Sequence, residues 1–124
     1  MDHDVLLTDF FAAITAGDID GVGEMYTDDV QVWHNVTDRA LDREGSLALL
    51  RYYVRTVDQR RYEIIERRHW DGGAVQRHVL HGRVGEAVIC APVCLTFAFR
   101  DGRISAIHEY VDEQAIAPML PTRA

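Results

Sequence analysis

The chain has 124 residues, 48% hydrophobic and 27% charged, a composition typical of one globular domain. Its formal net charge of −7 argues against nucleic-acid binding, which needs a concentrated basic face. No apolar run approaches the roughly 18 residues of a membrane helix, and the acidic start MDHDVLL lacks the basic segment of a secretory signal. We therefore expect a cytoplasmic protein without a membrane partner. The chain contains no lysine, which excludes a Schiff-base lysine and is typical of a high-GC bacterial genome.

The first half of the chain predicts three helices and one strand. Apolar side chains recur at helical spacing, Gly17 supplies a left-handed stop, and Asp18 and Asp42 are candidate N-caps. The strand covers residues 30–35. The predicted helices cover residues 4–16, Asp18 to about Tyr26, and about Arg43 to Val57.

The second half predicts strands alone, because it is rich in Val, Ile, Tyr, Phe and Thr and is divided by turn sequences. These turns are Asp71-Gly72-Gly73, Val84-Gly85-Glu86 and Asp101-Gly102. The order indicates an α+β fold in which three N-terminal helices pack on a curved, mostly antiparallel sheet. The predicted strands cover residues 61–70, 74–83, 87–99 and 103–112.

Two segments, GDIDGVGEMYTDDVQVWHN and DGRISAIHEYVDEQ, resemble SnoaL-like and ketosteroid-isomerase-like proteins of the nuclear-transport-factor-2-like superfamily. The resemblance covers nearly the whole chain, so we expect one such domain over residues 1–124. It implies a cone-shaped α+β barrel, with the sheet wrapped around an apolar pocket closed by the helices. It also implies a homodimer formed through the outer face of the sheet. The superfamily includes isomerases, cyclases, dehydratases, epoxide hydrolases and binding modules, so the resemblance indicates the fold better than the reaction.

A more distant likeness is to the limonene-epoxide hydrolases, which hold the attacking water with a Tyr-x-Asn pair, an Arg-x-Asp pair and a last-strand Asp. In this chain Trp33-His34-Asn35 falls on the first pair, Gln76-Arg77-His78 on the second, and Glu109 on the last-strand Asp. Only Asn35 is kept. The likeness therefore indicates where the site lies rather than which reaction it performs.

Strand alternation predicts which side chains face the pocket, because residues two apart share a face. We expect Asn35, Gln76, His78 and Glu109 to be the polar residues inside, with His34 facing outward unless the strand bulges there. The predicted substrate-binding lining is Trp33, Leu80, Ala91, Val93, Leu95, Phe97 and Ile107.

The four polar residues suggest acid–base chemistry. A neutral histidine is the usual general base near neutral pH, so we predict His78 as the base, with Glu109 hydrogen-bonded to its other ring nitrogen. The amides of Asn35 and Gln76 would hold a water or polarise a carbonyl oxygen. Each residue also has a structural interpretation: a satisfied core histidine, an ion-paired glutamate, a turn asparagine and a packing glutamine. We expect no metal, because His78 and His81 lie three apart on a strand and face opposite ways.

The leading hypothesis is a cofactor-independent isomerase, cyclase or dehydratase acting on a small lipophilic molecule. The first alternative is a non-catalytic binding or dimerisation module, which predicts that His78 and Glu109 do not touch. The second alternative is an epoxide hydrolase.

The outward set of the long strand is uncharged, which favours a homodimer through this face. It consists of Cys90, Pro92, Cys94, Thr96 and Ala98. The two cysteines are four apart, about 13 Å along a strand, which is too far for a disulfide. We expect two free thiols.

Overall fold

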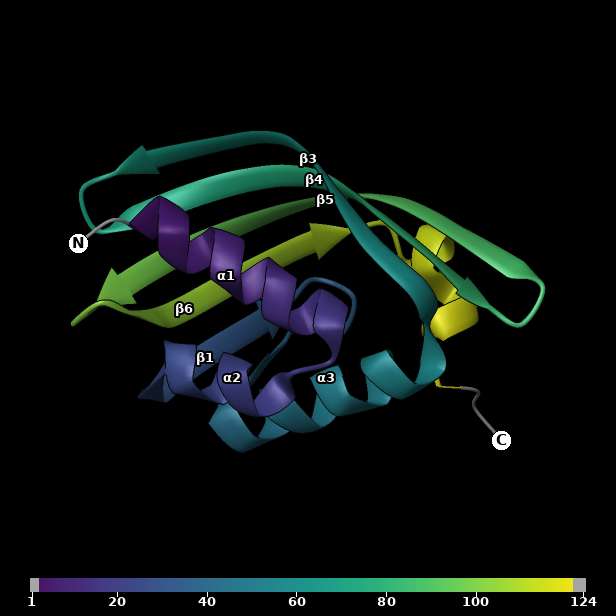
Figure 1. Ribbon diagram of the computed structural model, residues 1–124, viewed down its shortest axis with the longest axis horizontal. Helices are drawn as coiled ribbons and strands as arrows, with labels where there is room; N and C mark the ends of the chain where they lie inside the picture. The colour runs from purple at the N-terminus through teal and green to yellow at the C-terminus, as the bar shows by residue number, and fades with distance from the viewer. Residues whose placement is uncertain (1–2, 122–124) are drawn as a thin grey trace.

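The computed structural model describes residues 3–121 (Figure 1). It contains a long mixed sheet, three α-helices and a short 3₁₀ helix. In chain order these are α1 (His3–Ala16), α2 (Ile19–Met25), β1 (Tyr26–His34), β2 (Arg39–Leu41), α3 (Arg43–Thr56), β3 (Asp58–Trp70), β4 (Gly73–Val84), β5 (Ala87–Arg100), β6 (Arg103–Val111) and η1 (Glu113–Met119).

The helices begin and end where their local chemistry predicts. Gly17 has φ 82° and ends α1, a conformation that glycine adopts without steric cost. The side chains of Asp18 and Asp42 accept the backbone N–H of Gly21 and Gly45 at the starts of α2 and α3. Both predicted caps are therefore confirmed. None of the described helices is long and apolar enough to cross a membrane.

The sheet has six strands in the order β2-β1-β6-β5-β4-β3. Strands β3 to β6 form an antiparallel meander, whereas β1 pairs parallel to β6. The sheet does not close, so β2 and β3 form its two edges. Figure 1 shows α1, α2 and α3 together on one side of it, with η1 beyond the end of β6. The predicted α+β fold class is confirmed.

The core lies between the helices and the inner face of the sheet. From α1 it takes Leu7, Phe10, Phe11 and Ile14. The long strand β5 alternates as predicted: its odd-numbered residues from Ile89 to Phe97 are buried, and Cys90 and Pro92 are exposed. The predicted lining residues Leu80, Ala91, Val93, Leu95, Phe97 and Ile107 all face this core and are at most 7% exposed.

The observed elements differ from the predicted ones in four main places. Strand β3 begins at Asp58 rather than at residue 61. The first strand begins at Tyr26 rather than at residue 30, because Tyr26 already pairs with Ile104 ahead of a bulge. The three-residue strand β2 pairs with the end of β1 and was not predicted. The chain leaves the sheet at Asp112, whose side chain accepts the backbone N–H of Gln114 and starts η1.

Candidate functional site

One row of residues crosses five adjacent strands at the centre of the inner face. His34 on β1 is in register with Glu109 on β6, Glu109 with Leu95 on β5, Leu95 with Gln76 on β4, and Gln76 with Arg67 on β3. Neighbouring strands lie about 4.8 Å apart, so each residue of the row is next to the following one. His78 lies two positions further along β4, opposite Val93. The row therefore gathers the polar groups of the interior.

Glu109 faces inward between the buried residues Ile107 and Val111, as predicted. Protein surrounds its carboxyl group almost completely although part of the residue stays accessible, and this burial raises its pKa to about 7. Within residues 3–121 no side chain or backbone group forms a hydrogen bond with this carboxyl group. Glu109 is thus a carboxyl group that changes protonation near neutral pH and has no structural partner.

Three interior tyrosines share the surroundings of Glu109. Burial raises the pKa of Tyr26 to about 12 and raises the pKa values of Tyr53 and Tyr62 as well, and the negative charge of Glu109 adds to each increase. The hydroxyl of Tyr62 donates to that of Tyr53 at 3.5 Å. Three tyrosines with neutral hydroxyl groups therefore lie near enough to Glu109 for its charge to raise their pKa values.

His78 is 3% exposed, and its ring packs edge to face against Phe11 and Tyr62, with centroids 5.4 and 5.0 Å away. Burial lowers its pKa to about 4, and the positive charge of Arg67 adds to the decrease. Its Nδ1 lies 2.8 Å from the amide nitrogen of Gln76. His78 is therefore neutral at physiological pH and already hydrogen-bonded on one side.

The predicted hydrogen bond between His78 and Glu109 is absent from the described part of the chain. Two features explain this difference. Gln76 occupies Nδ1 of His78. Strand β5 also runs between β4 and β6, which places the two backbones about 10 Å apart across the sheet.

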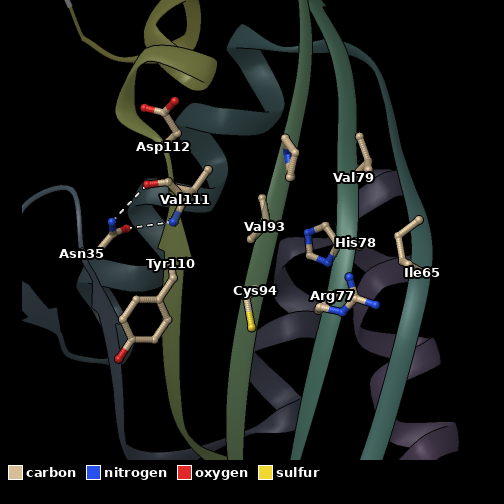
Figure 2. A pocket seen from close by; sticks show the side chains of 11 residues that line it. Asn35, Ile65, Arg77, His78, Val79, Val93, Cys94, Tyr110, Val111 and Asp112 are labelled. Carbon is tan, nitrogen blue, oxygen red and sulfur yellow. Dashed lines mark hydrogen bonds between the residues drawn. The ribbon is translucent and has the colours of Figure 1, made fainter.

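The predicted inward orientation of Asn35 was wrong. Asn35 lies in the turn that follows β1, and it is exposed at the protein surface. Its amide nitrogen donates to the carbonyl of Val111 and its amide oxygen accepts the Val111 N–H, both at 3.0 Å (Figure 2). Its backbone N–H donates to the carbonyl of Glu109. The asparagine thus extends the pairing of β1 with β6, and these bonds direct its amide toward the backbone of β6.

The predicted inward orientation of Trp33 was also wrong, because it belongs to the outer face. The buried residues of β1 that precede His34 most closely are Val30 and Val32, so His34 continues the inward set. The Trp33 ring packs against the outward rings of His108 and Tyr110, and its Nε1 donates to Asp38. The alternation of Val30, Gln31 and Val32 is the signal that could have identified this orientation.

Two residues that sequence reasoning did not place in the interior belong to the observed row. His34 is in register with Glu109, and burial lowers its pKa. The second is Arg67, whose side chain is only 11% exposed although it lies in the basic sequence Arg67-Arg68. Its Nε donates to Gln76 at 2.8 Å, and a terminal nitrogen donates to Asp4 and Thr8 of α1 at 3.0 and 2.9 Å. No local pattern indicates this inward turn, because a bulge in β3 between Ile64 and Glu66 changes the alternation.

A hollow of about 500 Å³ lies on the opposite, outer face of the sheet (Figure 2). Outward residues such as Arg77, Cys94 and Tyr110 border it, and neither Glu109 nor Gln76 does. Within the described residues, no three His, Cys, Asp or Glu side chains come together to hold a metal ion. The full lining of the hollow is Asn35, Ile65, Arg77, His78, Val79, Pro92, Val93, Cys94, Tyr110, Val111 and Asp112.

An open sheet with helices on one face is the fold that this chain shares with a ketosteroid-isomerase-like protein of known structure. The model of the SnoaL-like domain matches residues 7–107, so this chain belongs to the SnoaL-like family. No curated protein sequence matches the chain.

Solved structures resemble the whole chain. A protein from Shewanella denitrificans, assigned provisionally as a SnoaL-like polyketide cyclase, is 17% identical with a TM-score of 0.81, over 94% of each chain. A LEH-like epoxide hydrolase from M. tuberculosis is 22% identical with a TM-score of 0.76, over 93% of this chain and 86% of its own. A ketosteroid-isomerase-like protein from Catenulispora acidiphila, in complex with trimethylamine, is 15% identical with a TM-score of 0.80, over 94% of this chain and 93% of its own. At sequence identities of 15–22%, the similarity to these structures establishes the fold alone.

Proposed function

We propose that this protein is a cofactor-independent enzyme that transfers a proton on a small lipophilic substrate, with Glu109 as the general base. The observation that supports this most directly is an inward carboxyl group with a pKa of about 7 and no hydrogen-bond partner in the described chain. A general base works best when its pKa is near the operating pH. A carboxylate with only a structural role would be paired with a cation or with N–H donors, which would lower its pKa instead.

The surroundings of Glu109 support a lipophilic substrate. The inner face presents the buried side chains of Leu95, Val93 and Ile107 beside it, and the charge of Glu109 raises the pKa values of Tyr53 and Tyr62 nearby. A substrate bound against these residues would meet few polar groups, which favours a lipophilic molecule.

The proposed base is Glu109 rather than His78. Protonating His78 is unfavourable near neutral pH because burial lowers its pKa to about 4. Its Nδ1 also points at an amide nitrogen rather than into open space. Proton removal next to a carbonyl group by Glu109 is the step shared by isomerases, cyclases and dehydratases. Family membership and the resemblance to a provisionally assigned polyketide cyclase support this class of reaction.

The proposal can be tested without knowing the natural substrate. A panel of small lipophilic ketones is incubated with the protein in D₂O, and loss of the α-proton signal is followed by NMR. We expect exchange with at least one ketone, with a rate that rises as Glu109 ionises around pH 7. Glu109→Gln should reduce the rate by about 10²- to 10⁴-fold, the usual contribution of a general base. The matched control is Glu113→Gln, on the exposed surface of η1, which should exchange like the parent protein.

A second candidate is a non-catalytic module that binds a lipophilic ligand. The lack of a hydrogen bond between His78 and Glu109 favours it, since a base and its orienting carboxylate would touch. It predicts ketone binding without exchange and no effect of Glu109→Gln. The resemblance to the LEH-like hydrolase motivates adding epoxides to the same panel, where diol formation would indicate hydrolysis instead.

A further inference from the structure

A chain of hydrogen bonds leads from α1 through Arg67 and Gln76 to the buried ring of His78. Arg67 determines which atom donates and which accepts in each of the next bonds. An arginine side chain has only donors. Arg67 Nε therefore donates to Gln76 at 2.8 Å, and the atom that receives the bond must be the amide oxygen. The amide nitrogen of Gln76, which has only donors, then faces Nδ1 of His78 at 2.8 Å. The opposite amide orientation would place N–H groups of Arg67 and Gln76 against each other.

The same direction determines where the histidine carries its proton. Since Gln76 donates to Nδ1, that nitrogen must be the acceptor, and a neutral imidazole then carries its single proton on Nε2. We propose that Arg67 acts through Gln76 to hold His78 in this tautomer, so that the Nε2–H donates to an oxygen atom of the ligand. Arg67 and Gln76 are positioning residues in this arrangement, and His78 is the group that contacts the ligand.

Within residues 3–121 the Nε2–H has no acceptor, and Nε2 is not one of the fully buried unpaired side-chain atoms, which are Thr27 Oγ1 and Arg60 Nε. The N–H therefore keeps accessible surface at which an oxygen atom can accept its hydrogen bond. The neighbouring rings of Phe11 and Tyr62 exclude bulk water around this position. The donor is therefore directed at an oxygen atom in an otherwise apolar environment.

The chemical class of the ligand follows if Glu109 is the base, and this step rests on the proposed function. Glu109 and His78 lie on strands two apart, with backbones separated by about 10 Å. A substrate that spans this separation would lie over Val93 and Leu95 of β5, with an acidic C–H at one end and a carbonyl oxygen at the other. Proton removal places negative charge on that oxygen, where a preorganised N–H donor stabilises it. We therefore assign the substrate as a carbonyl compound.

The position of Arg67 is set by α1. Its terminal nitrogen donates to the backbone carbonyl and side chain of Asp4 and to the hydroxyl of Thr8. These contacts hold the guanidinium group against the sheet, with Nε toward Gln76. The first turns of α1 thus help to determine the hydrogen-bonding state of a residue in the core.

Two-dimensional ¹H–¹⁵N NMR of the imidazole nitrogens, at pH 8 without ligand, tests the tautomer directly. We expect His78 with the proton on Nε2 in the parent protein. Gln76→Glu should move the proton to Nδ1, because a carboxylate accepts from both Arg67 and the ring. Arg67→Met should give a mixture, because the amide is then free to turn over. Gln31→Glu on the exposed side of β1 is the matched control and should leave the tautomer unchanged.

A His78 proton found on Nδ1 in the parent protein would overturn the tautomer assignment. An unchanged spectrum in Arg67→Met would show that Arg67 does not hold the tautomer. If Arg67→Met fails to fold, the parent protein and the isosteric Gln76→Glu still decide the tautomer. None of these readouts depends on catalysis, so they stand or fall separately from the base assigned to Glu109.

The oxygen ligand is tested with cyclohexanone and methylenecyclohexane. The second compound has a CH₂ group in place of the carbonyl oxygen and is otherwise the same. We expect the ketone to shift the His78 Nε2 resonance in the parent protein and to shift it at least several-fold less in Gln76→Glu. The hydrocarbon should leave it unchanged in both. Equal shifts with both compounds, or none with the ketone, would overturn the ligand assignment while the tautomer result stands.

Discussion

Burial shifts the pKa values of Glu109 and His78, on the inner face of the sheet, in opposite directions. It disfavours the charged form of each, so it raises the pKa of the Glu109 carboxyl group and lowers the pKa of the His78 ring. At neutral pH the histidine is neutral and the glutamate is near half-ionisation. Of these two groups, only Glu109 therefore carries a charge at neutral pH.

The raised pKa of Glu109 predicts a pH-dependent destabilisation. Between pH 4.5 and about 7 the unfolded chain ionises this group while the folded chain keeps it protonated, so stability falls as pH rises. The difference of about 2.5 pKa units corresponds to about 3 kcal/mol, fully present above pH 7. Glu109→Gln should thus be more stable than the parent protein at pH 8, by up to about 3 kcal/mol, and equally stable at pH 4. Urea unfolding at both pH values measures this, and an unchanged difference between them would contradict the prediction.

The orientations of single residues were predictable where apolar neighbours define the face. On β4, β5 and β6 the buried residues flank Gln76, His78 and Glu109, and all three face inward as predicted. On β1 the likeness to a Tyr-x-Asn pair was given more weight than Val30 and Val32. The orientation assigned to this strand was consequently reversed. The bonds between Asn35 and Val111 join residues far apart in the sequence, so no local pattern reveals them.

At the scale of elements, composition and turn sequences predicted the helices and the antiparallel strands of the second half. The remaining elements depend on partners that are distant in the sequence. The strand β2 has three residues, too few to show alternation, and exists because β1 pairs with it. The parallel pairing of β1 with β6 brings together strands separated by most of the chain. The 3₁₀ helix η1 contains Pro118 and packs against β5, so its environment rather than helix propensity defines it.

Arg60 joins the ends of two helices to the start of β3. Its guanidinium group donates to the carbonyls of Val54 and Val57 at 2.9 and 2.7 Å and to the carbonyl of Thr15 at 3.0 Å. Carbonyls at helix C-termini lack intrahelical donors and favour a cation.

Arg60→Met should therefore lower the free energy of unfolding by about 2–3 kcal/mol, since hydrogen bonds from a charged donor contribute about 1.5–3 kcal/mol. Chemical denaturation followed by circular dichroism measures it. Arg61→Met, at the next and exposed position, is the control and should change stability by less than about 0.5 kcal/mol. Equal losses in the two variants would show that the helix-end contacts do not stabilise the fold.

At the scale of the whole molecule, the outer face of the sheet is unusually apolar. Its exposed large side chains include Ile65 and Tyr110, and Trp33 packs beside Tyr110. The two free cysteines, Cys90 and Cys94, lie on the same face. Charged side chains there are largely paired with one another, as in the contacts of Glu66 with Arg68 and Arg77. Apolar patches of this kind on a small domain mark interaction surfaces.

We predict that this face joins two copies of the chain in solution. The expected mass by size-exclusion chromatography with light scattering is twice the 14.1 kDa of one chain. Tyr110→Glu places a charge beside Trp33 and the outer hollow, and burying two unpaired carboxylates in a symmetric interface is unfavourable, so this variant should be monomeric. Val5→Glu introduces the same charge at an exposed position of α1, on the helical side, and should remain dimeric. A monomeric parent protein, or a dimer that survives Tyr110→Glu, would rule out this face as the contact between copies.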